Sequence, residues 1–252
     1  MLLACDIGNS SVKLAIYDSN ERLAFGLYPK KDFSCSTDIL SLTTKSNLRF
    51  DQFDAVYISS VVPAITDEIK NYVIENFKIE PTIINNDSKL SIKIDEAFKE
   101  DIGPDILVMS SYAYSKYHKE TLLISIGTAT VFAYVNNEGI LKGCAFAPGF
   151  KAFSTSLSEK STLLPSFTPE HQDKHLATNT IDAMSIGSFN GFCGMVNNLK
   201  DNIIKEYCQE PTVILCGGHS EKVKDYINNV DYFEKDFVTS GLNYLYNQKW
   251  KD

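Results

Sequence analysis

Short apolar runs that end in glycine turns recur along the chain and predict buried strands. One run ends in the turn Asp-Ile-Gly-Asn-Ser at residues 6–10, and another ends in Ser-Ile-Gly-Thr-Ala-Thr at residues 125–130. A β-rich run follows each turn directly, over 12–17 and 131–135. One strand-glycine-strand pattern is typical of an ordinary hairpin. Two in matching positions, about 120 residues apart, indicate a duplicated unit.

Elsewhere the chain alternates between strand-like and helix-like patterns, which is typical of an α/β fold. Thr66 precedes apolar positions at helical spacing up to Phe77, so it is the expected N-cap of that helix. Thr180 is the expected N-cap of a longer helix that runs to about Tyr207. The polar segment 158–179 is predicted to be a loop or lid. Strands are expected over 2–7, 12–17, 22–28, 55–62, 82–84, 90–94, 122–126, 131–135, 140–146 and 213–215, and further helices over 105–117, from 150 and over 238–246.

The length of 252 residues allows two domains, and the duplicated turn divides the chain into 1–118 and 119–252. Each part is long enough to bury a core of its own. We therefore expect two similar α/β halves that pack on a cleft.

Composition and charge narrow the class of protein. No apolar stretch is long enough to span a bilayer, and the first strand follows Met1 directly, which leaves no room for a signal peptide. A net charge of -8 without a basic cluster argues against a nucleic-acid partner. A cytoplasmic protein with reduced thiols is expected, because the six cysteines form no C-x-x-C pair and have no nearby histidines; they lie at 5, 35, 144, 193, 208 and 216.

A set of short motifs resembles those of type III pantothenate kinases in order and spacing, over essentially the whole chain. The motifs are Asp-Ile-Gly-Asn-Ser at 6–10, Ile-Ser-Ser-Val-Val-Pro at 58–63, Gly-Pro-Asp at 103–105, Ile-Gly-Thr-Ala-Thr at 126–130, Gly and Pro-Gly at 143 and 148–149, Asn-Thr-x-x-Ala-Met-x-x-Gly at 179–187, and Gly-Gly at 217–218. Each piece is common, whereas the ordered set is specific.

The resemblance implies two ribonuclease-H-like domains of the superfamily that contains acetate and sugar kinases, heat-shock cognate chaperones and actin. It further implies that ATP binds between the domains, that the protein is a homodimer, and that it phosphorylates pantothenate to 4'-phosphopantothenate, the first step towards coenzyme A.

The first glycine turn has the chemistry to bind phosphates, because backbone amides in such turns can face phosphate oxygens. Asp6 is the candidate ligand of Mg²⁺, a hard ion that prefers carboxylate and phosphate oxygens. The alternative for Asp6 is a carboxylate that caps the turn. The residues expected to cradle the nucleotide phosphates here are Gly8, Asn9, Ser10, Ser11 and Lys13.

Asp105 is the candidate catalytic base, the role that the resemblance gives to the matching aspartate. At the start of a helix a carboxylate is expected to stay ionised and to orient the acceptor hydroxyl. The alternative is an ordinary carboxylate in the first turn of a helix. The resemblance assigns substrate contacts to Gly103, Pro104, Asp105, Ile106 and Thr180.

Further nucleotide contacts are expected in the second half. Thr128 and Thr130 are assigned to the phosphate side, or else their hydroxyls pair across a hairpin. Gly217 and Gly218 allow close approach of adenine or ribose, or else form a plain turn after a strand. Thr180 either contacts substrate or simply caps its helix.

Four positions depart from the family pattern. Ile106 stands where an arginine helps to hold the substrate, and Ser125 stands where an aspartate is tied to a monovalent cation. Glu96 and Lys99 replace a tyrosine and a proline. Because a serine hydroxyl is a neutral ligand, Ser125 as a metal site predicts weak or absent dependence on K⁺ or NH₄⁺.

These departures leave two alternatives open. One is a kinase of the same fold with another small hydroxyl acceptor. The other is a nucleotide-binding regulatory paralogue that has lost turnover. The histidines are expected in surface or loop roles; they are His118, His171, His175 and His219.

Overall fold

The computed structural model describes residues 1–97, 102–159, 161, 164–207 and 210–248, and Lys99 and Cys208 lie outside these ranges. The chain forms two compact units. Unit 1 comprises Met1–His118, Gly139–Leu141 and Asp236–Asp252, and unit 2 comprises Lys119–Glu138 and Lys142–Lys235. The segment Asp236–Asp252 thus belongs to unit 1, whereas the bounds expected from the sequence place it in the second domain. Those bounds, and the cleft between the halves, stay predictions.

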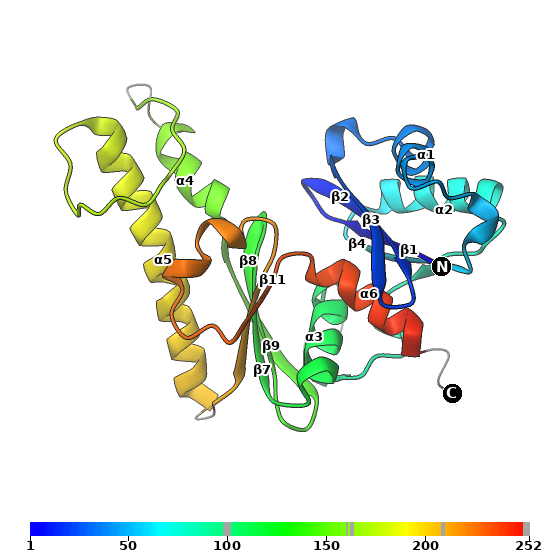
Figure 1. Cartoon of the computed structure of the whole chain (residues 1–252). Coiled ribbons are helices and arrows are strands. Elements are labelled where there is room, and N and C mark those ends of the chain that lie inside the picture. Colours follow the sequence, from blue (N-terminus) through cyan, green and yellow to red (C-terminus); the bar gives the residue numbers. More distant parts are fainter. Residues whose placement is uncertain (98–101, 160, 162–163, 208–209, 249–252) are drawn as a thin grey trace. The chain divides into compact units, whose positions relative to one another are not determined.

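Unit 1 is built on a mixed sheet with the strand order β3-β2-β1-β4-β5 (Figure 1). The first three strands form the expected antiparallel meander, and β4 and β5 then add in parallel. The parallel strands need crossover connections, which the helices of this unit supply. The strands are β1 Leu2–Ile7, β2 Ser11–Asp18, β3 Glu21–Pro29, β4 Ala55–Ser60 and β5 Thr82–Ile83.

The second sheet repeats this order. It runs β11-β10-β7-β8-β9-β6, so β9-β8-β7-β10-β11 follows the same sequence of neighbours as β3-β2-β1-β4-β5. Strand β7 pairs antiparallel with β8 and parallel with β10, as β1 does with β2 and β4. The two glycine turns therefore belong to two sheets with the same strand order. The strands are β6 Lys93–Ile94, β7 Thr121–Ile126, β8 Ala129–Val135, β9 Ile140–Pro148, β10 Thr212–Cys216 and β11 Tyr232–Glu234.

Two pairs of helices cover the sheet of unit 1 (Figure 1). Helices α1 (Cys35–Lys45) and α2 (Pro63–Phe77) share a core with alternate residues of β1, among them Leu3 and Cys5. Helices α3 (Pro104–Tyr117) and α6 (Phe237–Gln248) pack on each other and on β4. Tyr57 of β4 meets Tyr246 of α6 edge to face, with ring centroids 5.8 Å apart. Because successive strand residues alternate between faces, Ser59 shares the face of Tyr57 that α6 covers.

In unit 2, helices α4 (Phe150–Glu159) and α5 (Thr180–Tyr207) pack on the sheet. Phe150 of α4 lies edge-on to Phe192 of α5, at 5.2 Å between ring centroids. Both belong to the core cluster that includes residues of β7, β8 and β10. In the described part of the chain, no helix combines the length and the apolarity needed to cross a bilayer. Short 3-10 helices lie at Lys30–Asp32, Phe50–Gln52, Ser220–Lys222 and Lys224–Tyr226.

Both helix N-caps expected from threonine are wrong. Helix α2 begins at Pro63 rather than after Thr66, because proline suits the first helical position, and the Thr66 hydroxyl donates to Ser60 Oγ at 2.6 Å. Helix α5 includes Thr180, and Asn179 is its cap: the Asp182 N–H donates to Asn179 Oδ1 at 2.9 Å. The sequence analysis predicts neither helix α1, although its buried residues Cys35, Ile39 and Leu42 have helical spacing, nor strand β11, which spans three residues.

Candidate active site

Three side chains meet at the end of β1 because of how the strands of unit 1 align. Asp6 is the register partner of Lys13 on β2 and of Ser59 on β4. Register partners point to the same face of a sheet, so the three side chains share the face that α6 covers. Lys13 Nζ donates to Asp6 Oδ2 at 2.9 Å, and both side chains are largely buried. The buried carboxylate thus has a counter-charge.

Asp105 lies in the first turn of α3 and interacts electrostatically with this pair. Burial raises the pKa of the Asp105 carboxyl above its ordinary value, and the negative charge of Asp6 raises it further. Hydrogen bonds from the backbone N–H groups of Ile106 and Asp105, and the charge of Lys13, act in the opposite direction. The start of α3 was expected to keep the Asp105 carboxylate ionised. The loss of its hydration on burial outweighs that effect, so the net shift of its pKa is upward.

The neighbours of Asp105 shape its surroundings. Gly103 is the N-cap of α3, and a β-carbon there would lie 2.6 Å from Asp105 Oδ1. Glycine thus leaves the room that the carboxylate occupies. Pro104 fills the first helical position, where its missing N–H costs no hydrogen bond. Ile106 is 3% exposed, so a core side chain fills the position where the resemblance places an arginine.

The first glycine turn is fixed by backbone hydrogen bonds on several sides. The Gly8 N–H donates to the Ser11 carbonyl at 2.9 Å, so this amide closes the hairpin rather than facing a ligand. The Lys30 N–H donates to Ser10 O, and the Val61 N–H donates to Ile7 O, both at 3.0 Å. Asn9 and Ser10 are exposed at the tip, and Glu96 is exposed elsewhere in unit 1.

The second turn, in unit 2, lacks the charges of the first. Ser125 on β7 is the register partner of Val131 on β8 and of Cys216 on β10. With strands matched by their order in the two sheets, these residues stand where unit 1 has its charged pair and Ser59. Ser125 is partly buried between two buried apolar neighbours. A cation at this strand end would meet a neutral oxygen.

The two threonines of the second turn differ in their surroundings. Thr130 is fully buried, and its hydroxyl donates to the Pro148 carbonyl at 3.0 Å. Thr128 is exposed at the tip. Of the two, Thr128 alone has its side chain at the surface of unit 2.

The segment after β10 packs directly on the second turn. Gly217 has a φ of +97°, and a β-carbon there would lie 2.6 Å from the backbone nitrogen of Ile126. Gly218 has open space around its α-carbon, with nothing within 4 Å of an added β-carbon. The His219 N–H donates to Ile126 O at 3.0 Å, and His219 Nδ1 lies 3.2 Å from Gly127 O. The backbone thus requires glycine at 217 but not at 218.

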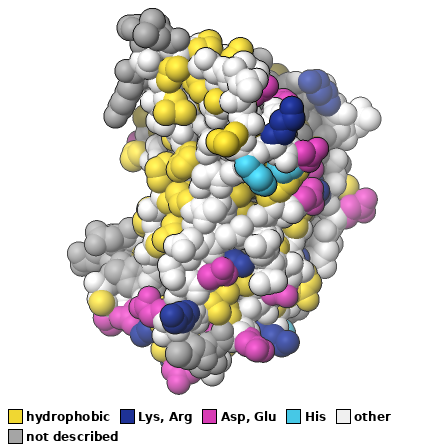
Figure 2. All heavy atoms as spheres, turned by 90° about the vertical axis from the view of Figure 1, so that its left-hand side faces the viewer, with side chains coloured by type: hydrophobic (Ala, Val, Ile, Leu, Met, Phe, Trp, Pro, Cys, Tyr) yellow, Lys and Arg dark blue, Asp and Glu magenta, His cyan; other side chains and the backbone are white. Residues whose placement is uncertain are grey.

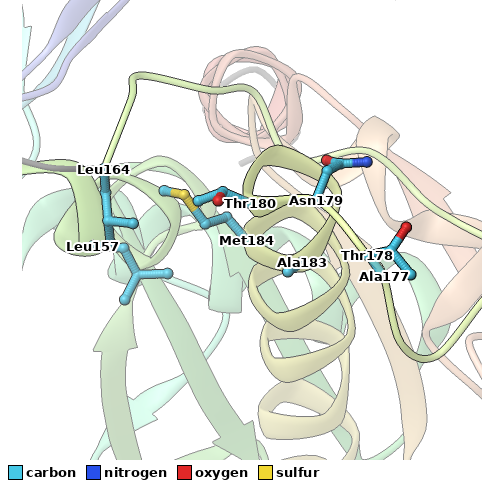
Figure 3. Close-up of a pocket in the computed structure, with 8 residues that line it drawn as sticks. All are labelled: Leu157, Leu164, Ala177, Thr178, Asn179, Thr180, Ala183 and Met184. Carbon is cyan, nitrogen blue, oxygen red and sulfur yellow. The ribbon is translucent and has the colours of Figure 1, made fainter.

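Thr180 lines a shallow hollow of about 550 Å³ in unit 2, at the start of α5 (Figure 3). Thr180 and Met184 point toward Leu157 and Leu164, whereas Thr178 lies on the other side of the helix start. The hollow is more apolar than polar, and Thr180 supplies a hydroxyl on its wall. Thr180 belongs to unit 2 and Asp105 to unit 1.

The donor atoms of the described residues limit where a metal ion can bind. Within the described ranges, no three His, Cys, Asp or Glu side chains cluster as a ligand set, and the five cysteines there are not joined by disulfides. The Asp6 carboxylate fits Mg²⁺, which takes one or two carboxylates and completes its shell with phosphates and water. Beside it, the fully buried Ser59 hydroxyl has no hydrogen-bond partner among the residues that the structure describes. An unsatisfied buried hydroxyl points to a further polar group at this strand end.

His219 lies in the loop after β10, as expected, but the sequence did not predict its contacts with the second turn. The available signal was its position: it directly follows the glycine pair that ends β10, next to the strand that leads into the second turn.

Gly217 and Gly218 allow a matched test of whether the backbone requires glycine at each position. Gly217→Ala is expected to lower the free energy of unfolding by at least about 2 kcal/mol, from its positive φ and its overlap with Ile126. Gly218→Ala is expected to change it by no more than about 0.5 kcal/mol. Urea unfolding followed by circular dichroism measures both; equal losses would contradict the assignment.

The chain is similar to known proteins in sequence and in fold. The family model described as type III pantothenate kinase matches residues 2–202. The type III pantothenate kinase of Geobacter sulfurreducens is 30% identical over 251 residues, covering 98% of each chain.

Two solved structures share the fold. One is described as a Baf family transcriptional activator from Campylobacter jejuni, with a TM-score of 0.61, 17% identity and coverage of 99% of this chain and 100% of that one. The other is described as an N-acetylglucosamine kinase from Porphyromonas gingivalis, with a TM-score of 0.57, 10% identity and coverage of 99% and 100%. At such identities the likeness concerns the fold alone, and it confirms the predicted actin-like ATPase fold. By the family match over most of its length, the chain belongs to the type III pantothenate kinase family.

Proposed function

We propose that this chain transfers the γ-phosphoryl group of ATP to the primary hydroxyl of pantothenate, with Asp105 as the base. Pantothenate kinase activity and the use of ATP come with the family. The observation that supports the assignment of residues is the ion pair of Asp6 with Lys13 in unit 1, which interacts electrostatically with Asp105. Two carboxylates and one ammonium are the groups that metal binding, phosphate binding and proton transfer require.

In the proposed step, the acceptor hydroxyl oxygen attacks the γ-phosphorus while the bond from that phosphorus to the bridging oxygen of ADP breaks. The hydroxyl proton passes to the Asp105 carboxylate. ADP leaves with the electron pair of the broken bond. Because the transition state of phosphoryl transfer is loose, orienting the hydroxyl matters more than the strength of the base.

The raised pKa of Asp105 suits this role. A carboxyl whose pKa lies above its ordinary value accepts a proton more readily than an exposed one, provided that it is ionised beforehand. Lys13 opposes the upward shift and so favours the ionised form. Gly103 keeps the space next to the carboxylate open.

Phosphate binding in unit 1 is assigned to Lys13 and to the amides of Asn9, Ser10 and Ser11. Asp6 would hold Mg²⁺, which when bound neutralises phosphate charge. Lys13 is close enough to the same site to contact phosphate with its ammonium group.

In unit 2 we assign nucleotide contacts to the exposed tip of the second turn, at Thr128, and to the open position Gly218. Thr180 is assigned to pantothenate, because its hydroxyl stands on the wall of a largely apolar hollow.

Ile106 is buried and carries no charge, so it cannot bind the acid group of an acceptor such as pantothenate. Without an arginine at this position, the acid group of pantothenate needs a cation from elsewhere. A kinase with another small hydroxyl acceptor is therefore the second candidate. A regulatory protein without turnover is less favoured, because a pure nucleotide binder has no need of a buried carboxyl with a raised pKa.

The deciding experiment is an ADP-release assay with ATP, Mg²⁺ and pantothenate, run on wild type and Asp105→Asn. Wild type is expected to turn over, and the variant to lose about 10²- to 10⁴-fold in kcat. A panel of other small alcohols in the same assay tests the second candidate. ATP binding without turnover of any acceptor would favour the regulatory role, and a variant that keeps most of its activity would remove Asp105 from its role.

The thermal stability of Asp105→Asn shows whether a loss of activity comes from the missing base or from unfolding. Because the folded-state pKa of Asp105 is raised above 3.8, ionisation costs stability as pH rises through the folded-state pKa. Asp105→Asn removes this cost. Relative to wild type, it is expected to unfold at a higher temperature at neutral pH, and the difference is expected to vanish on acidification. Thermal unfolding across pH measures it.

Ser125 predicts little dependence on monovalent cations. Activity in K⁺, NH₄⁺ and Na⁺ at equal ionic strength is expected to agree within about twofold, because a neutral hydroxyl between apolar neighbours binds a cation weakly. The control is Ser125→Asp, which restores a carboxylate and is expected to introduce a preference among the cations. Strong activation of wild type by K⁺ over Na⁺ would contradict this prediction.

We also infer a homodimer that forms through the apolar surface around the start of α5, and a cytoplasmic location that free thiols support. Leu176 is 89% exposed and Ile181 is 53% exposed, and both adjoin the lining of the hollow. Hydrophobic side chains gather in the upper part of the face shown in Figure 2. Exposed apolar patches of this kind mark interaction sites.

Light scattering after size exclusion tests the dimer. Wild type is expected at twice the 28.2 kDa of one chain. The double change Leu176→Glu and Ile181→Glu is expected to give monomers. Leu27→Glu, at a residue of β3 that is 58% exposed, is the control and is expected to stay dimeric. A monomeric wild type would overturn the inference.

A further inference from the structure

His219 joins the end of β10 to the second glycine turn by two contacts. Its backbone N–H donates to Ile126 O at 3.0 Å, and its ring Nδ1 lies 3.2 Å from Gly127 O. A carbonyl oxygen can only accept a hydrogen bond, so the contact assigns the proton to Nδ1. The side chain is partly buried against the turn rather than extended into solvent. Consecutive carbonyls of the turn are therefore held by one residue.

This contact sets the direction of the next amide. A peptide group is planar and trans, so the C=O of Gly127 and the N–H of Thr128 point in opposite directions. With the Gly127 carbonyl directed to the imidazole, the Thr128 N–H is directed to the other side of the turn. Rotation of this peptide plane would break the ring contact. The imidazole thus selects one orientation of the amide at the tip.

A comparison of the two glycine turns shows what the His219 side chain adds. In unit 1 the Val61 N–H donates to Ile7 O at 3.0 Å, which matches the bond from the His219 N–H to Ile126 O. Valine has no side-chain donor, and the first turn has instead a backbone bond from the Lys30 N–H to Ser10 O. The second turn receives its additional donor from the imidazole.

The turn is enclosed from another direction by Gly149. A β-carbon at Gly149 would collide with the carbonyl oxygens of Gly127 and Thr128. The backbone of the turn is therefore packed closely against the start of α4, and His219 fixes the carbonyl within that packing. A turn constrained in this way is preorganised, so little ordering remains to be done when a ligand binds.

We propose that His219 is a positioning residue for the nucleotide: by donating from Nδ1 to Gly127 O, it holds the second turn in the orientation that binds ATP. The inference rests on the proposed use of this turn by the nucleotide. It assigns the imidazole neither a proton-transfer step nor contact with the acceptor.

The test compares two replacements of the same side chain. Asparagine can place its amide N–H near the position of Nδ1, whereas alanine has no donor. His219→Ala is expected to weaken ATP binding by roughly 3- to 10-fold, the effect of one hydrogen bond. His219→Asn is expected to stay within about twofold of wild type. Calorimetric titration with MgATP, in the absence of pantothenate, measures the affinity of each.

Two further measurements distinguish positioning from a merely structural role. In the kinase assay, His219→Ala is expected to raise KM for ATP while kcat at saturating ATP and KM for pantothenate stay unchanged. Amide hydrogen exchange is expected to become faster at residues 127–130 in His219→Ala but not in His219→Asn. Thermal unfolding verifies that both variants are folded.

His118→Asn is the matched control. His118 is exposed at the end of α3 with a φ of 49°, a conformation that asparagine adopts readily, and it belongs to unit 1. Its replacement is expected to leave ATP affinity and exchange in the turn unchanged.

The outcomes separate this inference from the proposed function. Weaker ATP binding in His219→Ala, with rescue in His219→Asn, supports positioning even if pantothenate is not the acceptor. Equal ATP affinity of His219→Ala and wild type would overturn the inference while leaving the kinase assignment intact. Asparagine as poor as alanine would also overturn it, because the effect would then not depend on the donor. A wild type that binds no ATP would overturn both.

Discussion

The ion pair between Asp6 and Lys13 depends on the alignment of three strands, and the rest of the site follows from it. A carboxylate at the buried end of a central strand is costly unless a cation reaches it. Antiparallel pairing of β1 with β2 places Lys13 directly beside Asp6, 2.9 Å away. Asp105 then adds a second carboxylate from the start of α3, and its raised pKa reflects both burial and the charge of Asp6. Charge is thereby concentrated in one small region of unit 1.

The two sheets show how a duplicated topology can serve different purposes. Both have a central strand that enters a glycine turn, with an antiparallel neighbour on one side and a parallel one on the other. In unit 1 the register places charged side chains together, whereas in unit 2 the same register brings Ser125 next to Val131 and Cys216. The second turn is consequently shaped by close packing and hydrogen bonds, with Gly149 on one side and His219 on another.

Much of this arrangement could be predicted from the sequence. Apolar runs gave most strands, and the ordered motifs gave the family, the fold and the activity, which the comparisons confirm. What the sequence left out depends on contacts between distant segments. Thr130 reads as a ligand-binding hydroxyl until its bond to Pro148 is known. His219 reads as an ordinary loop residue until its ring contact with Gly127 O is known. Thr66 and Thr180 suggested helix starts because threonine is common there, but Pro63 and Asn179 define the starts better.

The counter-ion of Asp6 also has a consequence for the order in which ligands enter. A free metal ion that approaches this carboxylate must displace an ammonium group already in contact with it. A metal ion that binds together with a polyphosphate brings anionic oxygens with it. The ammonium group of Lys13 can then pair with these oxygens instead of with Asp6. With Asp6 as the proposed metal ligand, nucleotide and metal would be favoured as a joint ligand, and Lys13 balances the charge of Asp6 until they bind.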